Sequence, residues 1–245
     1  MYDFSGKTIM ITGGASGIGL ATAKAFTAWN ANVAVIDMRP IDQTIPLADD
    51  NRYLYIQADI TKEAVVAACV QQIVDHFGHL HLAYNNAGIG GDFAPVHEYP
   101  TDDWDKVMAI NLKAVFLCMK YQIRAIMKAG GGAIVNCASL LASVAYENDS
   151  AYVVSKFGVL GLTKNAALEY ANKGIRINCV SPGFTNTPMV NQAAESKIQA
   201  IINRHPIGRL AEPHEIAAAV GWLCSDASSF AIGLDLRVDG GYTLL

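Results

Sequence analysis

Seven short apolar runs, rich in β-branched residues, alternate along this chain with longer stretches of helical pattern. The runs predict strands over residues 7–12, 32–37, 52–59, 80–85, 132–138, 175–181 and 235–239. The stretches between them predict helices over 17–29, 62–77, 104–129, 151–172 and 213–225. Strands that alternate with helices form βαβ units and a parallel sheet covered on both faces. We therefore predict a single α/β domain, residues 1–245, with a doubly wound parallel sheet of about seven strands.

Charge and composition argue against several classes of protein. The chain is 52% hydrophobic with a formal net charge of −4, and no basic stripe favours nucleic acid. No run of roughly eighteen apolar residues predicts a membrane span, and the first residues lack the pattern of a secretion signal. The five cysteines form no C-x-x-C pair, which is typical of reduced thiols and predicts a cytoplasmic protein. His79 and His81 lack an acidic partner, so no metal site is predicted.

The predicted helices 104–129 and 151–172 are more apolar than one buried face requires. We expect a second copy of the chain to bury the remaining apolar surface of these helices, which predicts a homodimer or homotetramer. The alternative is that both helices pack deep inside a large core.

A glycine-rich turn separates the first predicted strand from the first predicted helix. The segment Thr12–Gly19 reads TGGASGIG, with its glycines spaced as Gly13, Gly17 and Gly19. Glycine permits a tight turn and lets the backbone approach a pyrophosphate, while the next helix offers free N–H groups to the anion. We expect a dinucleotide here; the alternative is an ordinary turn between a strand and a helix.

The second predicted strand ends in an acid, Asp37. A carboxylate there accepts hydrogen bonds from the adenosine ribose hydroxyls and repels a 2′-phosphate. No Arg or Lys lies within the glycine turn, and Arg39 is expected to stack on adenine or face solvent. These features favour NAD(H) over NADP(H), unless Asp37 is only an exposed acid at a strand end.

The next two strand ends extend the expected cofactor site. Asp59 ends the third predicted strand and is expected to bond the adenine amine, with Ile60 against the ring. Asn85–Gly88 reads NNAG after the fourth strand, and its small residues let backbone lie against a cofactor. All these ends fall at the carboxyl edge of a parallel sheet, where ligands bind.

The segment AYVVSK places Tyr152 and Lys156 four positions apart in a predicted helix. That spacing puts both side chains on one helix face. A nearby ammonium favours the phenolate form of tyrosine and so improves it as a general base. Ser139 ends the fifth predicted strand, and a fold-back of the chain would bring both hydroxyls to one substrate oxygen. The alternatives are interfacial helix residues for the pair and a turn cap for Ser139.

Several motifs occur in an order that resembles the short-chain dehydrogenase/reductase family, namely the glycine turn, NNAG, Asn111, Ser139, the Tyr152–Lys156 pair and Pro182-Gly183. The resemblance covers about Gly6 to Tyr242. It implies a Rossmann-type oxidoreductase of alcohols and carbonyls that uses NAD or NADP and forms dimers or tetramers. The catalytic roles it implies are acid/base for Tyr152, phenolate support and ribose binding for Lys156, substrate-oxygen binding for Ser139, and positioning of a relay water for Asn111.

The same resemblance implies the cofactor contacts. Those expected around the pyrophosphate, adenosine and ribose are Gly13, Ser16, Gly17, Ile18, Gly19, Asp37, Asp59, Ile60, Asn86, Ala87 and Gly88. Tyr152, Lys156, Pro182 and Gly183 are expected to contact the nicotinamide end of the cofactor. Thr185 and Thr187 are candidates for its carboxamide or the phosphates. For Asn111, capping or pairing with backbone is the alternative.

A mostly apolar substrate wall is expected beside Ser139 and Tyr152, from Ile89, Phe93, Leu140, Leu141, Tyr146, Phe184 and Met189. Simple core packing is the alternative for each of these residues. The chain after Pro182-Gly183 is expected to form a lid, residues 184–209, that is helical between Thr187 and His205. No arginine cluster lines this region, which favours a neutral substrate.

The sequence therefore predicts an NAD-dependent enzyme that interconverts a secondary alcohol and a ketone by hydride transfer. One alternative is an NADPH-linked reductase of 3-oxoacyl thioesters, which Asp37 disfavours. The other is a sensor that binds a dinucleotide without catalysis, which the intact set of Ser139, Tyr152 and Lys156 disfavours.

Overall fold

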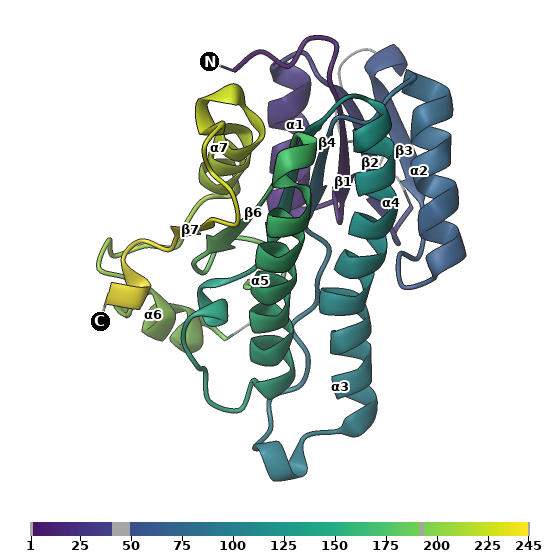
Figure 1. The fold of residues 1–245 in the computed structure, drawn as a ribbon. Coiled ribbons are helices and arrows are strands. Elements are labelled where there is room, and N and C mark those ends of the chain that lie inside the picture. Colours follow the sequence, from purple (N-terminus) through teal and green to yellow (C-terminus); the bar gives the residue numbers. More distant parts are fainter. Residues whose placement is uncertain (1, 41–49, 192–193, 245) are drawn as a thin grey trace.

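A computed structural model describes residues 2–40, 50–191 and 194–244 of the chain (Figure 1). Within them, seven strands form one sheet in the order β3-β2-β1-β4-β5-β6-β7, and every neighbouring pair is parallel. The strands are β1 Thr8–Thr12, β2 Asn32–Asp37, β3 Tyr53–Gln57, β4 Leu82–Asn85, β5 Gly132–Cys137, β6 Ile175–Pro182 and β7 Asp235–Val238. The order runs outward in both directions from β1 and β4, which confirms the predicted doubly wound sheet and single domain.

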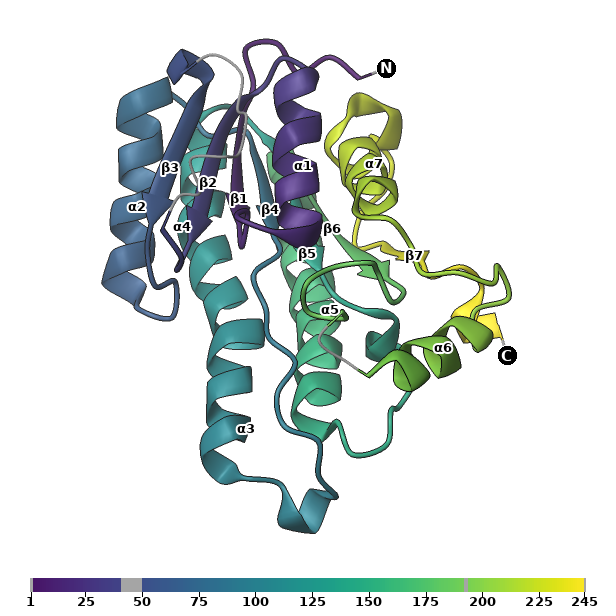
Figure 2. The same ribbon diagram turned by 180° about the vertical axis from the view of Figure 1, so that it is seen from behind.

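Helices cover both faces of the sheet. One face carries α1 Gly17–Ala28 and α7 Pro213–Cys224, seen in front in Figure 2. The other carries α2 Glu63–Phe77, α4 Ala114–Lys128 and α5 Ser150–Tyr170, seen in front in Figure 1. Two further helices, α3 Thr101–Met108 and α6 Glu195–Asn203, lie beyond the carboxyl ends of the strands in both views.

Alternating side chains in the strands supply the two halves of the core. Ile9 and Ile11 of β1 pack with residues of α1 and α7, whereas Met10 packs with residues of α2, α4 and α5. All three are fully buried. Because a strand points successive side chains to opposite faces, near-continuous apolar strands are what a sheet covered on both sides requires.

The predicted helix 104–129 is wrong as one regular helix. Helical structure begins earlier, at Thr101, and a π-helical segment, Ala109–Lys113, separates α3 from α4. A π-helical turn closes hydrogen bonds over one more residue than an α-helical turn, and such segments occur frequently at functional sites. Here it buries Asn111 completely.

The expected helical lid is also shorter than predicted. Of the residues described between Thr187 and His205, Glu195–Asn203 form α6 and 188–191 form turns, whereas residues 192 and 193 of the predicted lid lie outside the described residues. The other predicted elements are present, with ends that coincide with the prediction or differ from it by at most two residues.

The five cysteines are buried free thiols. Among the residues described, no helix has the length and hydropathy to cross a membrane. Over the same residues, no three His, Cys, Asp or Glu side chains gather as metal ligands would.

Candidate active site

The site lies at the carboxyl edge of the sheet, where the strand order reverses between β1 and β4. This position is the switch point at which doubly wound sheets bind ligands. The sheet brings the glycine turn after β1, Asp37 of β2 and the NNAG segment after β4 to one edge.

The glycine turn has the geometry that its sequence predicts. Gly13 and Gly17 have φ of 65° and 52°, in the left-handed region that favours glycine. A Cβ on Gly19 would lie 2.2 Å from the Gly13 carbonyl oxygen, so only glycine fits there. Asn86 Nδ2 donates to that same oxygen at 3.1 Å, which ties the turn to the segment after β4.

Thr12 is a part of the turn that sequence reasoning missed. Its Oγ1 accepts hydrogen bonds from the backbone N–H groups of Asn86 and Ala87, at 3.0 and 3.2 Å. A buried threonine at the end of a strand has no local sequence signal for such a role. It fixes the NNAG backbone against the glycine turn.

Asp37 is 8% exposed and is held by an unforeseen partner. Arg39 donates from its backbone N–H and its Nε to Asp37 Oδ1, at 3.0 and 3.2 Å, and Ala15 N–H donates to Oδ2 at 3.0 Å. Burial alone would raise the pKa of Asp37, but these hydrogen bonds outweigh it and hold the pKa below its ordinary value.

The Arg39 side chain is 55% exposed, in agreement with one of the two expectations for it, but it is also held by the glycine turn. Its Nη2 donates to Ser16 Oγ at 2.8 Å, so the guanidinium bridges the strand end and the glycine turn. Asp59, in the loop after β3, accepts from Thr61 N–H and Oγ1 at 2.9 and 2.6 Å, and these bonds lower its pKa. Ile60 is partly buried against the core beside it.

Tyr152 and Lys156 lie one turn apart on α5, as predicted. The Lys156 Nζ is 5.4 Å from the centroid of the Tyr152 ring and donates to the Cys137 carbonyl oxygen at 2.9 Å. Lys156 is only 4% exposed, so its ammonium is placed by the end of β5 rather than by solvent. Sequence reasoning missed this acceptor because a backbone carbonyl leaves no residue-type signal.

Asn111 pairs with backbone, one of the two alternatives for it. Its Oδ1 accepts from Ile89 N–H and its Nδ2 donates to Ile89 O, both at 2.9 Å. Nδ2 also lies 3.2 Å from Ser155 Oγ, which donates to the Tyr152 carbonyl oxygen. Asn111 thus fixes the chain after β4 to α5.

Gly88 leaves room for this arrangement. A Cβ there would lie 3.3 Å from Asn111 Oδ1 and 3.6 Å from Lys156 Nζ. A side chain beyond Cβ would enter the space between the amide and the ammonium. The NNAG segment therefore meets the Tyr–Lys pair as well as the glycine turn.

Ser139 caps a short turn, and it keeps a free proton. Its Oγ accepts from Leu141 N–H at 3.1 Å, as the capping alternative predicts. Because that hydroxyl accepts here, its own O–H remains available to donate. The capping role and the predicted contact with a substrate oxygen are compatible.

Most of the predicted substrate wall lies together. Leu140, Leu141, Tyr146, Tyr152 and Phe184 share one apolar cluster, which also includes the unforeseen Tyr242. Phe93 meets the edge of Tyr146 with ring centroids 6.3 Å apart. Ile89 and Met189 are not part of this cluster, and Met189 is 50% exposed.

The segment after β6 reaches the glycine turn. A Cβ on Gly17 would lie 3.2 Å from Thr187 Cγ2, so Thr187 lies against the glycine turn. Thr185 is 3% exposed and donates to the Gly183 carbonyl oxygen at 3.0 Å. Pro182 ends β6 at the same edge of the sheet.

Asp149 is an acid that sequence reasoning passed over. It directly precedes α5, is 6% exposed, and its Oδ1 has no hydrogen-bond partner among the described residues. Burial raises the pKa of Asp149 to about 7. Ionisation of this carboxyl therefore opposes folding at neutral pH and above.

We expect Asp149→Asn to remove a pH dependence of stability. A raised carboxyl pKa stabilises the fold fully below the unfolded value near 4, and this contribution is lost as pH rises through about 7. Between pH 5 and pH 8, the wild-type protein should lose on the order of 2 kcal/mol more of its free energy of unfolding than the variant loses. Urea denaturation at the two pH values measures this, and parallel changes in both proteins would contradict it.

The fold and these groups define a nucleotide-binding oxidoreductase. A family model described as Enoyl-(Acyl carrier protein) reductase matches residues 13–243. Cyclohexanol dehydrogenase of Acinetobacter sp. (strain SE19) is 42% identical over 246 residues, with 98% of this chain and 96% of that protein covered. The chain belongs to the short-chain dehydrogenase/reductase family, which binds a nicotinamide cofactor.

Solved structures agree with this assignment. Levodione reductase superposes with a TM-score of 0.92 at 34% identity, covering 98% of this chain and 99% of its own. ElxO with NADP bound superposes with a TM-score of 0.91 at 31% identity, again covering 98% and 99%. Because this relative is described with NADP, similarity alone leaves the choice between NAD and NADP open.

Proposed function

We propose that this protein is an NAD(H)-dependent oxidoreductase that interconverts a neutral secondary alcohol and a ketone. The observation that carries the proposal is the buried Lys156 ammonium beside the Tyr152 ring, next to the apolar cluster that contains Tyr146 and Phe184. The similarity to a cyclohexanol dehydrogenase supports a cyclic alcohol as substrate.

In this proposal the chain's own residues handle the proton. A nicotinamide bound here would supply the hydride acceptor for the carbinol carbon. Tyr152, as phenolate, takes the hydroxyl proton, and Lys156 stabilises the phenolate by its charge. Ser139 donates its free O–H to the substrate oxygen. In the reducing direction Tyr152 protonates that oxygen. Asn111 is assigned to positioning the proton relay, because it is hydrogen-bonded to the Ile89 backbone and to Ser155 on the helix that carries Tyr152.

The residues at the sheet edge fit a dinucleotide. The N-cap residue of α1, Ser16, makes no side-chain capping bond, so the first N–H groups of the helix can face a pyrophosphate. Gly13, Gly17 and Gly19 keep the approach free of side chains. We assign four further residues to contacts with the bound dinucleotide, namely Ile18, Asn86, Ala87 and Gly88. Asp59 and Ile60 are assigned to adenine, and Pro182, Gly183, Thr185 and Thr187 to the nicotinamide end.

Asp37 supports the choice of NAD over NADP. Its buried carboxylate would face the adenosine ribose and repel a 2′-phosphate, although Arg39 lies against it. We expect wild type to favour NAD⁺ over NADP⁺ in kcat/KM by at least about tenfold, and Asp37→Ala to reverse that preference because Arg39 then pairs with the phosphate. Initial rates with both cofactors measure this. A wild-type preference for NADP⁺ would overturn the assignment.

A panel of secondary alcohols with NAD⁺ tests the proposed function, with NADH absorbance as the readout. The panel includes cyclohexanol and an open-chain alcohol, and a 3-oxoacyl thioester with NADPH forms a separate arm. We expect turnover of cyclic alcohols with NAD⁺. Turnover of the thioester alone would favour the acyl-thioester reductase, and cofactor binding without any turnover would favour the sensor.

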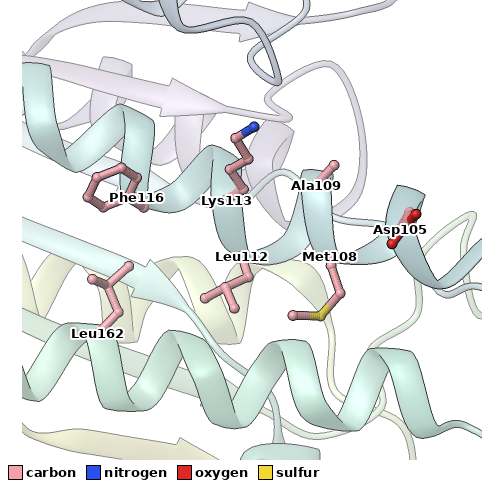
Figure 3. A pocket seen from close by; sticks show the side chains of 7 residues that line it. All are labelled: Asp105, Met108, Ala109, Leu112, Lys113, Phe116 and Leu162. Atoms are coloured by element: carbon pink, nitrogen blue, oxygen red, sulfur yellow. The ribbon is translucent and has the colours of Figure 1, made fainter.

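We infer that the protein forms a homodimer through α3, α4 and α5. A mostly apolar groove of about 560 Å³ lies at these helices. Figure 3 shows the residues that line it, namely Asp105, Met108, Ala109, Leu112, Lys113, Phe116 and Leu162. Phe116 is 48% exposed and Phe157, on α5, 47%. A two-fold axis near Ala109 would set Asp105 of each copy against the partner's Lys113. A homotetramer would require a second interface. Sedimentation of a monomer at micromolar concentration would contradict the dimer.

Two further assignments belong to this proposal. The segment 184–209, with α6 inside it, serves as the substrate lid. Its Lys197 lies 5.8 Å from the Phe93 ring centroid, which links α6 to the loop after β4. The five buried free thiols suit a reducing, cytoplasmic setting.

A further inference from the structure

Two buried polar atoms lie in an aromatic cluster beside the proposed substrate wall. His205 and Tyr242 are 3% and 5% exposed, with ring centroids 4.9 Å apart in an edge-to-face arrangement. Phe184 joins them, at 6.0 Å from His205 and 5.8 Å from Tyr242. Neither His205 Nε2 nor the Tyr242 hydroxyl has a hydrogen-bond partner among the described residues.

The hydrogen bond at His205 Nδ1 determines whether Nε2 of the same ring donates or accepts. His205 Nδ1 lies 2.8 Å from the carbonyl oxygen of Ile201. A carbonyl can only accept, so Nδ1 carries the proton, and Nε2 of the neutral ring is an acceptor. Tyr242 supplies the complement, because burial raises the pKa of its phenol and keeps the O–H protonated. The cluster thus offers one acceptor and one donor.

Both side chains adjoin segments that form the proposed site. Tyr242 belongs to the same apolar cluster as Tyr152 and Tyr146. A Cβ on Gly183 would lie 3.1 Å from His205 Nε2, so that nitrogen lies against the chain that leaves β6. Figures 1 and 2 both place the C-terminal turn beside α6, the helix that leads to His205.

Buried polar atoms in native proteins nearly always have partners, so this pair calls for an ordered water or a bound group. The group must donate to Nε2 and can accept from the Tyr242 hydroxyl. A hydroxyl does both, whereas a carboxylate or a ketone oxygen only accepts. The apolar residues around the pair suit a carbon ring or chain that carries such a hydroxyl.

We propose that His205 and Tyr242 together bind a second hydroxyl of the substrate, so that the preferred alcohols are diols or polyols. This inference rests on the proposed function and narrows its substrate class. The reacting hydroxyl lies at Tyr152 and Ser139, while the second hydroxyl lies at the His205–Tyr242 pair. A diol therefore makes one more buried contact than cyclohexanol at the same catalytic set.

The test compares 1,4-cyclohexanediol, as separate cis and trans isomers, with cyclohexanol. We expect wild type to favour one diol isomer in kcat/KM, and Tyr242→Phe to lower the diol-to-cyclohexanol ratio at least about tenfold. His205→Asn keeps a donor for Ile201 O but removes the distal nitrogen, and should lower the ratio likewise. His205→Gln, which keeps a distal polar atom, should restore part of it. An unchanged ratio in Tyr242→Phe would overturn the inference.

Tyr170→Phe, which loses a hydroxyl at the far end of α5, is the matched control and should leave the ratio unchanged. Binding is read separately, as the rise in melting temperature that the diol causes with NADH present. That rise should be lost in Tyr242→Phe. The fold of this variant should remain intact, because the removed hydroxyl has no hydrogen-bond partner among the described residues. If wild type oxidises neither alcohol, the proposed function fails, and an equal diol-induced shift in both proteins would overturn the binding pair on its own.

Discussion

Replacing Tyr152 with phenylalanine should lower kcat for alcohol oxidation by about a hundredfold to ten-thousandfold, the usual contribution of a general acid/base. The variant loses one hydroxyl and keeps the ring that packs in the cluster with Leu141 and Phe184. Cofactor affinity should change little, because NADH is assigned mainly to the glycine turn and strand ends. Steady-state rates together with NADH fluorescence titration separate the two effects.

Tyr170→Phe is the matched control for this experiment as well. It removes the same atom from the same helix, but at the opposite end of α5 and beside Lys173. Its kcat should equal that of wild type. If Tyr152→Phe retained wild-type turnover of every tested alcohol, the assignment of Tyr152 as acid/base would be wrong.

Replacing Lys156 with methionine should also lower kcat by about a hundredfold or more at neutral pH. Methionine fills similar space but removes both the positive charge beside Tyr152 and the hydrogen bond to the Cys137 carbonyl. Because a positive charge favours the phenolate form of tyrosine, its removal should change the dependence of kcat/KM on pH. The pH profile of kcat/KM measures this.

Lys164→Met provides the comparison, because Lys164 is exposed on the same helix. It should leave both kcat and the pH profile as in wild type. An unchanged profile in Lys156→Met would show that its charge does not act on the proton transfer. A loss limited to NADH affinity would instead restrict Lys156 to cofactor binding.

The sheet and the glycine turn were predictable because their signals are local. The strands are buried on both faces, so each reads as a short apolar run, and β1 ends directly at the glycines. Gly13, Gly17 and Gly19 were identifiable because left-handed backbone and close approach leave few other choices of residue. The four-residue spacing of Tyr152 and Lys156 likewise follows from the geometry of one helix.

The remaining parts of the site depend on contacts between distant segments. The π-helical segment around Asn111 lies in a run whose apolar pattern continues without a break, so the sequence predicts one regular helix there. Arg39 donates hydrogen bonds to both Asp37 and Ser16, and the sequence around either residue gives no sign of this arrangement. His205 and Tyr242 come from separate segments and meet only through folding of the C-terminal turn against the end of α6.

Transfer of deuterium from the carbinol carbon to the nicotinamide is a direct test of hydride transfer from a secondary alcohol to NAD⁺. Cyclohexanol or 1,4-cyclohexanediol deuterated at the carbinol carbon is incubated with NAD⁺ and the protein, and the products are analysed by mass spectrometry. We expect one ketone to form for each NADH, with the deuterium in the nicotinamide, and both products to be lost in Tyr152→Phe. Absence of deuterium from the NADH, or transfer to NADP⁺ alone, would contradict this prediction.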